Sequence, residues 1–293
     1  MAEWELRPLS LGEILDRTFT LYRKNFLLFL GISGIPHLLT LGMNISRLLM
    51  TKFPIVSTQP HAPGVRVQNL GAGGPWGPFG IVGVLLVIIV TLVVYLFAQG
   101  GTIYAVSDLY LGRSATIAGS LKRMWGQLGN LFGVTMLNGM AIGLSFLLLI
   151  IPGFYVACRL LTCVPAALLE DLGARASLER SWELTRDNAA RAFLILLLYF
   201  ALAYGIAMVF VAPFSFMMAF SMKDPGMLRL YMVLTQVGSF LSQLLVTPFL
   251  LIATAVFYYD LRVTKEAFDL QMLMNPESAS SVPTPSTVPT ILG

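Results

Sequence analysis

Long hydrophobic runs alternate with short polar segments along most of the chain. A helix needs roughly 20 apolar residues to cross a hydrocarbon core of about 30 Å. Runs of this length predict an all-α integral membrane bundle of about six transmembrane helices, near residues 26–46, 79–106, 131–151, 153–170, 192–220 and 228–259. We expect one helical membrane domain over residues 1–274 and a disordered tail rich in Pro, Ser and Thr at 275–293.

The polar segments contain a recurring Leu-x-Arg-x-aromatic pattern. Its three copies are Leu15/Arg17/Phe19, Leu121/Arg123/Trp125 and Leu178/Arg180/Trp182, and the arginines are followed after seven or eight residues by Asn25, Asn130 and Asn188. Each copy precedes an odd-numbered hydrophobic run. This predicts three repeated units, each with an interfacial amphipathic helix and two crossing helices, beginning near residues 10, 114 and 174. Alternatively, Arg and Trp simply favour the cytosolic interface, which requires no repeat.

The first amphipathic segment has a defined start. Ser10 and Glu13 have the spacing of a capping box, in which each side chain bonds a free amide of the first turn. After this start, one helical face holds Leu11, Leu15, Phe19 and Tyr22, and off it lie Asp16, Arg17, Thr20 and Lys24. We expect this helix to lie in the membrane interface, with Arg17 off its apolar face.

Prolines and glycines mark irregular points. A segment from Thr51 to Pro78 rich in Pro and Gly predicts an external loop. Pro152 and Gly153 predict a tight turn between the third and fourth spans. The fifth and sixth spans are longer than a straight crossing needs and contain prolines, at 213 and 248, so a tilt, a kink or a break is expected.

Composition and charge support a membrane location and give an orientation. Hydrophobic residues make up 56% of the 293 residues and charged residues 12%, against roughly 25% charged in soluble domains. Lys and Arg concentrate in cytoplasmic loops. If the N-terminus is cytoplasmic, the basic residues on the cytoplasmic side are Arg7, Arg17, Arg23, Lys24, Arg113, Lys122, Arg123, Arg175, Arg180, Arg186, Arg191, Arg262 and Lys265. Those on the outer side are only Arg47, Lys52, Arg66, Lys223 and Arg229. We expect both termini in the cytoplasm, and no cleaved signal peptide.

Polar residues inside the spans are candidates for a functional site. These candidates are Arg159, Asn138, Gln99, Gln236 and Gln243. Arg159 stands out because a charge in hydrocarbon is costly and needs a partner. It would bind an anionic headgroup or solute, or else reach the outer interface near Pro152 or pair with a carbonyl or an amide such as Asn138.

Two spans also have polar stripes at helical spacing: Thr91, Tyr95, Gln99 and Thr102 in the second, and Gln236, Ser239, Gln243 and Thr247 in the sixth. They would line a solute path or, more commonly, form hydrogen bonds between helices.

Catalytic and nucleic-acid-binding patterns are absent from the sequence. The only histidines are His37 and His61, and no metalloprotease, nucleophile-elbow, phosphate-loop or dinucleotide motif occurs. Cys158 and Cys163 are five residues apart, which predicts neither a disulfide nor a metal site. The most charged segment has Glu183/Arg186 and Asp187/Arg191 at helical contact spacings. We expect no cofactor and no nucleic-acid partner.

Several ordered stretches resemble a known family. They are Arg7–Arg17, then Pro152, Gly153, Tyr155, Arg159, Pro165 and Glu170, then Leu178–Arg186, and finally Tyr259–Phe268. With these stretches the chain resembles the membrane domain associated with glycerophosphoryl diester phosphodiesterases, which also occurs as stand-alone bacterial membrane proteins. The resemblance implies a helical module in a bacterial plasma membrane. In the enzymes the hydrolase is a separate soluble barrel with its own histidines and carboxylates, so we do not expect the activity here.

We therefore expect a non-catalytic protein whose cytosolic amphipathic segments engage membrane lipid headgroups or a partner protein. The candidate interface consists of Arg17, Phe19, Arg123, Trp125, Glu170, Arg180 and Trp182. The alternatives are a small-solute transporter or channel and, less favoured, a membrane-embedded lipid phosphodiesterase.

Overall fold

The structure is a computed structural model that describes residues 9–50, 78–221 and 224–274. Its elements are helices: α1 (Leu11–Lys24), α2 (Phe26–Met50), α3 (Pro78–Tyr110), α4 (Ile117–Trp125), α5 (Leu128–Leu148), α6 (Ile150–Arg159), α7 (Cys163–Leu169), α8 (Ala174–Leu184), α9 (Ala189–Phe210), α10 (Ala212–Phe220) and α11 (Pro225–Met274). Most of the loop predicted from Thr51 to Pro78 lies outside the described residues, and Pro78 begins α3. The tail at 275–293 and the basic residues Arg7, Lys52, Arg66 and Lys223 also lie outside them.

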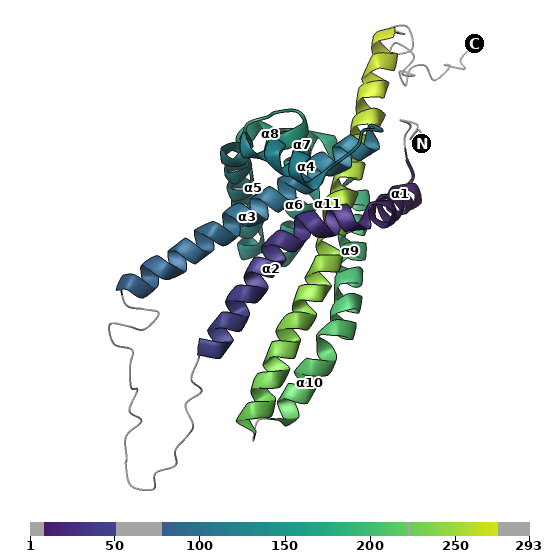
Figure 1. The fold of residues 1–293 in the computed structure, drawn as a ribbon. Helices are drawn as coiled ribbons and strands as arrows, with labels where there is room; N and C mark the ends of the chain where they lie inside the picture. Colours follow the sequence, from purple (N-terminus) through teal and green to yellow (C-terminus); the bar gives the residue numbers. More distant parts are fainter. Residues whose placement is uncertain (1–8, 51–77, 222–223, 275–293) are drawn as a thin grey trace, which may run out of the picture.

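Six stretches of helix are long and apolar enough to span a membrane, among the residues described. They are Phe26–Leu48, Ile81–Tyr110, Leu128–Leu148, Ile150–Leu169, Ala189–Phe210 and Gly226–Glu266. The predicted all-α membrane bundle is thereby confirmed. α11 is its central helix and packs against α1, α2, α3, α9 and α10 (Figure 1).

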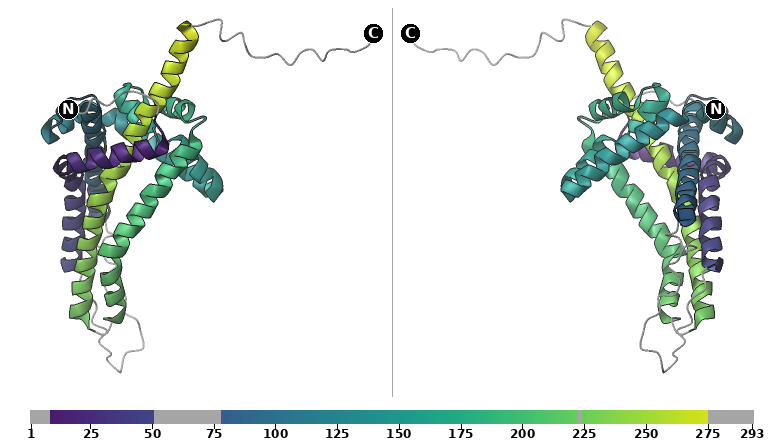
Figure 2. Two further views of the ribbon diagram at one scale, coloured as in Figure 1. Left: turned by 90° about the vertical axis from the view of Figure 1, so that its right-hand side faces the viewer. Right: turned by 90° about the vertical axis from the view of Figure 1, so that its left-hand side faces the viewer.

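The short helices α1, α4, α7 and α8 gather at one end of the bundle, which we call the short-helix side (Figures 1 and 2). The fully buried apolar residues are concentrated near this end, for example Ile14 of α1, Met124 of α4 and Phe257 of α11. Away from it, α3 and α5 expose many large apolar side chains, among them Leu86 and Leu147. This distribution fits a bundle whose far parts are surrounded by lipid.

α5 and α6 form a hairpin whose turn differs from the prediction. The turn falls at Leu149, where the backbone is extended, and Pro152 lies inside the first turn of α6. A proline is tolerated there because its missing N–H would have no partner within the helix. A Cβ at Gly153 would overlap the ring of Phe146, so glycine allows the two helices to approach closely. The hairpin diverges from α9 and α11 (Figure 2).

Two of the spans predicted from the sequence, 153–170 and 192–220, are interrupted, and the longest one is not. The fourth span divides into α6 and α7, with a turn at residues 160–162. The fifth breaks at Val211 between α9 and α10, because Pro213 cannot donate a hydrogen bond to the preceding turn. α11 continues through Pro248. A tilt, a kink or a break was expected at each proline; the helix breaks next to Pro213 and continues through Pro248.

Candidate functional site

The first two arginines of the repeated pattern point toward other helices. Arg17 is buried, which the sequence did not predict, and its Nη1 donates to the hydroxyl of Tyr110 at 2.7 Å. Arg123 lies over the ring of Tyr104 at 4.4 Å and 3.6 Å from the carboxylate of Asp108. Both arginines therefore join a short helix to the end of α3.

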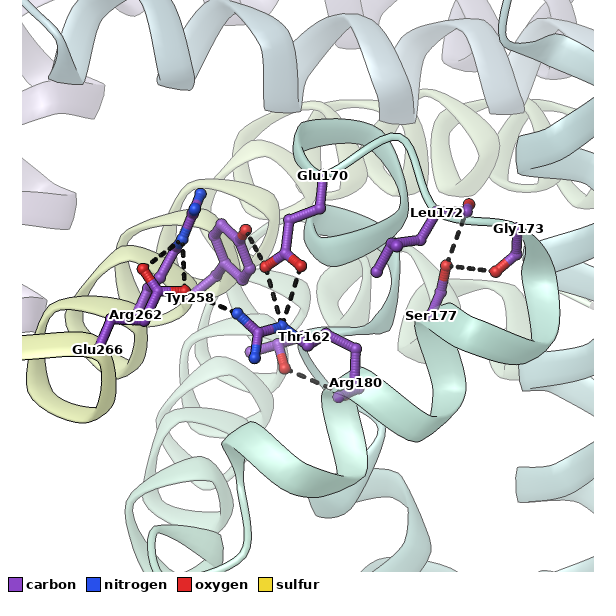
Figure 3. Close-up of polar contacts among 10 residues, drawn as sticks. Thr162, Glu170, Leu172, Gly173, Ser177, Arg180, Tyr258, Arg262 and Glu266 are labelled. Atoms are coloured by element: carbon purple, nitrogen blue, oxygen red, sulfur yellow. Dashed lines mark hydrogen bonds and ion pairs between the residues drawn. The ribbon is translucent and has the colours of Figure 1, made fainter. Parts of the chain in front are cut away.

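The third arginine, Arg180, lies in a charged network between α7, α8 and α11 (Figure 3). Its Nε donates to both carboxylate oxygens of Glu170, at 3.0 and 2.9 Å, and its Nη2 donates to Glu266 at 2.7 Å. The hydroxyl of Tyr258 also donates to Glu170, at 2.7 Å, and Arg262 donates to Glu266 at 2.9 and 2.8 Å. Burial alone would lower the pKa of Arg180, but the hydrogen bonds and charges of the two glutamates raise it. Arg180 therefore stays charged and connects α8 to the end of α7 and to α11.

A second network on this side could not be predicted from the sequence. The side chain of Asp260 accepts from the backbone N–H of Leu9 at 2.6 Å and from Nη2 of Arg191 at 2.8 Å. Arg191 also donates to the carbonyl of Leu9 at 2.6 Å and to Asn188 at 3.1 Å. This network joins the start of the described chain, α9 and α11, and its members are up to 251 residues apart.

The residues noted for their helical contact spacing near the end of α8 do not pair with each other. The ion pairs Glu183/Arg186 and Asp187/Arg191 do not form among the described residues. The four residues after α8 form turns, so helical spacing does not apply to them. Asp187 instead lies 3.7 Å from Lys265.

The aromatic residues of the pattern are turned outward. Phe19 is 47% exposed, Trp125 is 74% exposed and Trp182 is 41% exposed. Each ring still packs on one neighbouring ring: Phe249, Phe97 and Tyr155, at centroid distances of 4.8, 5.4 and 6.0 Å. Arg17 and Arg180 thus face the protein, while the aromatic two residues later remains accessible at the surface.

The aligned asparagines have different roles, so the repeat stays a prediction. Asn25 donates to the carbonyl of Leu21 in its own helix, and Asn130 donates to the carbonyl of Leu172. Asn188 accepts from Arg191.

Arg159 was expected to reach the outer interface or to pair with a carbonyl or an amide such as Asn138, but its Nε and the Oδ1 atom of Asn138 both lack a hydrogen-bond partner. It is the last residue of α6, and its guanidinium lies over the ring of Trp182 in α8, 4.5 Å from the ring centroid. The hydroxyls of Ser181 and Thr185 donate to its backbone carbonyl at 2.9 and 2.8 Å. These contacts with α8 and the residue after it place Arg159 next to the short-helix side.

Three residues of the two polar stripes line one small cavity. This cavity, of about 10 Å³, is lined by residues that include Tyr95, Gln99 and Thr247, and His37 lies 3.2 Å from the hydroxyl of Thr247. Such a volume holds about one water.

The remaining candidates lie elsewhere. The Oε1 atom of Gln236 accepts from Asn44 at 3.3 Å, while the side chain of Gln243 is exposed. The side-chain oxygens of Gln99 and Asn138 have no hydrogen-bond partner. Cys158 and Cys163 are free and buried. Among the described residues, no group of three His, Cys, Asp or Glu could hold a metal ion.

Comparison with known families assigns about the C-terminal half of the chain, which contains most residues of the two charged networks, to a family. A family model, the membrane domain of glycerophosphoryl diester phosphodiesterase, matches residues 137–285. The chain belongs to this family. No curated protein and no solved structure matches it.

The family match is to a membrane domain and not to a catalytic domain. It includes Arg159, Glu170, Arg180, Trp182 and Asp260, and it leaves α1 to α4 outside. With its apolar helices, this membership fits an integral, multi-pass membrane protein.

Proposed function

We propose that this member of the family is a non-catalytic protein of a bacterial plasma membrane that engages phospholipid headgroups through its short-helix side. In this proposal the short-helix side and both termini face the cytoplasm. The observation that supports it most is the placement of the pattern residues: Arg17 and Arg180 are engaged inside the protein, whereas Phe19, Trp125 and Trp182 are exposed. Trp and Tyr favour the headgroup region of a bilayer because their rings are amphipathic.

Charge at the surface supports the same role. The short helices and their flanking segments also expose basic side chains, namely Arg23, Lys24, Arg113, Lys122, Arg175 and Arg186. Each basic residue near an anionic leaflet contributes about 1 kcal/mol of attraction. Acidic residues such as Asp16 and Asp171 are also exposed there, so the attraction is moderate.

Mild extraction tests this proposal. The full chain is purified in a mild detergent, and the co-purifying phospholipid and protein are quantified by mass spectrometry. We expect retained phospholipid. A partner protein retained in stoichiometric amount without phospholipid would assign the short-helix side to a protein partner instead, and retention of neither would contradict the proposal.

Two alternatives have less support. A small-solute transporter or channel would use Arg159 and the polar stripes, but the cavity where the stripes meet is too small for a solute larger than about one water. Uptake by the purified protein in liposomes would favour it. A lipid phosphodiesterase would be favoured by metal-dependent turnover of a glycerophosphodiester by this chain alone.

A further inference from the structure

A groove of about 870 Å³ opens between the α5–α6 hairpin and α8. Its lining residues are Ala141, Ser145, Val156, Arg159, Leu160, Leu178, Glu179, Trp182, Glu183 and Arg186. The apolar residues Ala141, Val156 and Leu160 line the side of α5, α6 and the turn after α6, whereas the lining residues from α8 are mostly charged or aromatic. The groove thus has an apolar wall that continues into the lipid-exposed hairpin and a charged rim on the short-helix side. We call it the α6–α8 groove.

Arg159 is the buried cation of this groove. It is 3% exposed, and its Nε has no hydrogen-bond partner. None of the ion pairs between described residues includes it, in contrast to Arg180 and Arg191. Its guanidinium lies over the rings of Trp182 and Tyr155, at 4.5 and 5.9 Å. Stacking leaves the in-plane N–H donors free, and a buried charge without hydrogen bonds is costly unless an anion supplies them.

The rim charges decide which anion fits. Arg186 is exposed at the rim, and so are Glu179 and Glu183. Glu179 pairs with Arg175 outside the groove at 3.0 Å, and Glu183 is engaged through its backbone carbonyl, by Lys265. Because Glu179 is paired with Arg175, the groove presents two cations, Arg159 and Arg186, and one carboxylate, that of Glu183. A headgroup that is only anionic would leave this carboxylate without a cation. A group with a phosphate and a nearby ammonium satisfies both signs.

We propose that the α6–α8 groove binds one phospholipid with a phosphoethanolamine headgroup. The phosphate accepts from the guanidinium groups of Arg159 and Arg186, a geometry that suits arginine. The ammonium lies toward Glu183, and an acyl chain follows the apolar wall along Val156 and Leu160. The inference rests on the proposed function and adds to it a defined site and a headgroup preference.

The test uses the full chain purified in mild detergent and loaded with phosphatidylethanolamine or phosphatidylglycerol of matched acyl chains. Bound lipid is counted by native mass spectrometry. We expect each chain to retain one phosphatidylethanolamine, at least tenfold better than phosphatidylglycerol. Arg159→Gln should abolish this retention, and Glu183→Gln should remove the preference. The control Arg47→Gln, in the last turn of α2 and away from the groove, should bind as the wild type does.

A second groove variant and two soluble competitors complete the test. Because Arg159→Gln changes a buried residue, Ala141→Phe provides a second variant that fills the groove by bulk alone and should also lose the lipid. Free phosphoethanolamine and inorganic phosphate are added as competitors; displacement at equal concentration would mean that the groove takes a soluble phosphate instead. If the wild type retains phospholipid and both groove variants retain it equally, the α6–α8 groove is not the binding site, while the proposed function stands. If the wild type retains none, both proposals fail.

Discussion

Replacing Asp260 with Asn removes one negative charge from the network that joins Leu9, Arg191 and α11. The side chain of Asp260 is 0% exposed, and it accepts from the Leu9 amide and from Arg191 at 2.6 and 2.8 Å. Asn keeps the size of the side chain and one oxygen for the Leu9 amide. The loss therefore falls on the charged interaction with Arg191.

The magnitude follows from what Arg191 keeps. Removing one partner of a buried pair costs about 3–5 kcal/mol, and a hydrogen bond to a charged group contributes about 1.5–3 kcal/mol. The side chain of Arg191 is 25% exposed, and it retains its bonds to the Leu9 carbonyl and to Asn188. We expect Asp260→Asn to lower the free energy of unfolding by about 2 kcal/mol.

A double-mutant cycle measures this interaction directly. Unfolding of the purified protein in mixed micelles is followed by circular dichroism for Asp260→Asn, Arg191→Gln and both together. We expect a coupling energy of about 1–2 kcal/mol. The matched control is the exposed pair Arg175/Glu179, at 3.0 Å, which should couple by less than about 0.5 kcal/mol. A coupling energy between Asp260 and Arg191 below about 0.3 kcal/mol, the usual additivity error, would refute the reasoning.

Two other substitutions test the packing around the site. Glu170→Gln should destabilise the protein by about 1.5–3 kcal/mol, because Arg180 loses the carboxylate that accepts from its Nε; an effect as small as that of Arg175→Gln in the same unfolding assay would contradict it. Gly153→Ala should destabilise by about 1–3 kcal/mol through overlap with the ring of Phe146, and Phe146→Leu in the same chain should restore most of the loss. Failure of the second change to restore stability would mean that the two helices do not meet there.

The membrane helices could be predicted because their signal is local. A hydrophobic run of sufficient length specifies a span without knowledge of its neighbours. The capping box of Ser10 and Glu13 is equally local, and it is present at 2.7 and 3.3 Å. The capping box depends on residues within one turn of each other, and a span depends on a single continuous run.

The partners of the charged residues could not be predicted because they depend on packing between distant helices. Arg17 was expected off the apolar face, yet it bonds Tyr110, 93 residues away. Arg159 was expected inside the span or near its outer end. The turn after α6 places it beside Trp182 instead. Hydropathy gives the length of an apolar run, but it does not show where the run bends.

The central claim is that the exposed aromatics of the short helices lie among phospholipid headgroups, and tryptophan quenching tests it most directly. The chain has four tryptophans, so a variant that keeps only Trp125 can be reconstituted in bilayers of lipids brominated at a shallow or a deep acyl position. We predict strong quenching by the shallow bromines, weaker quenching by the deep ones and little by aqueous iodide. Strong quenching by iodide with none by either brominated lipid would contradict the claim.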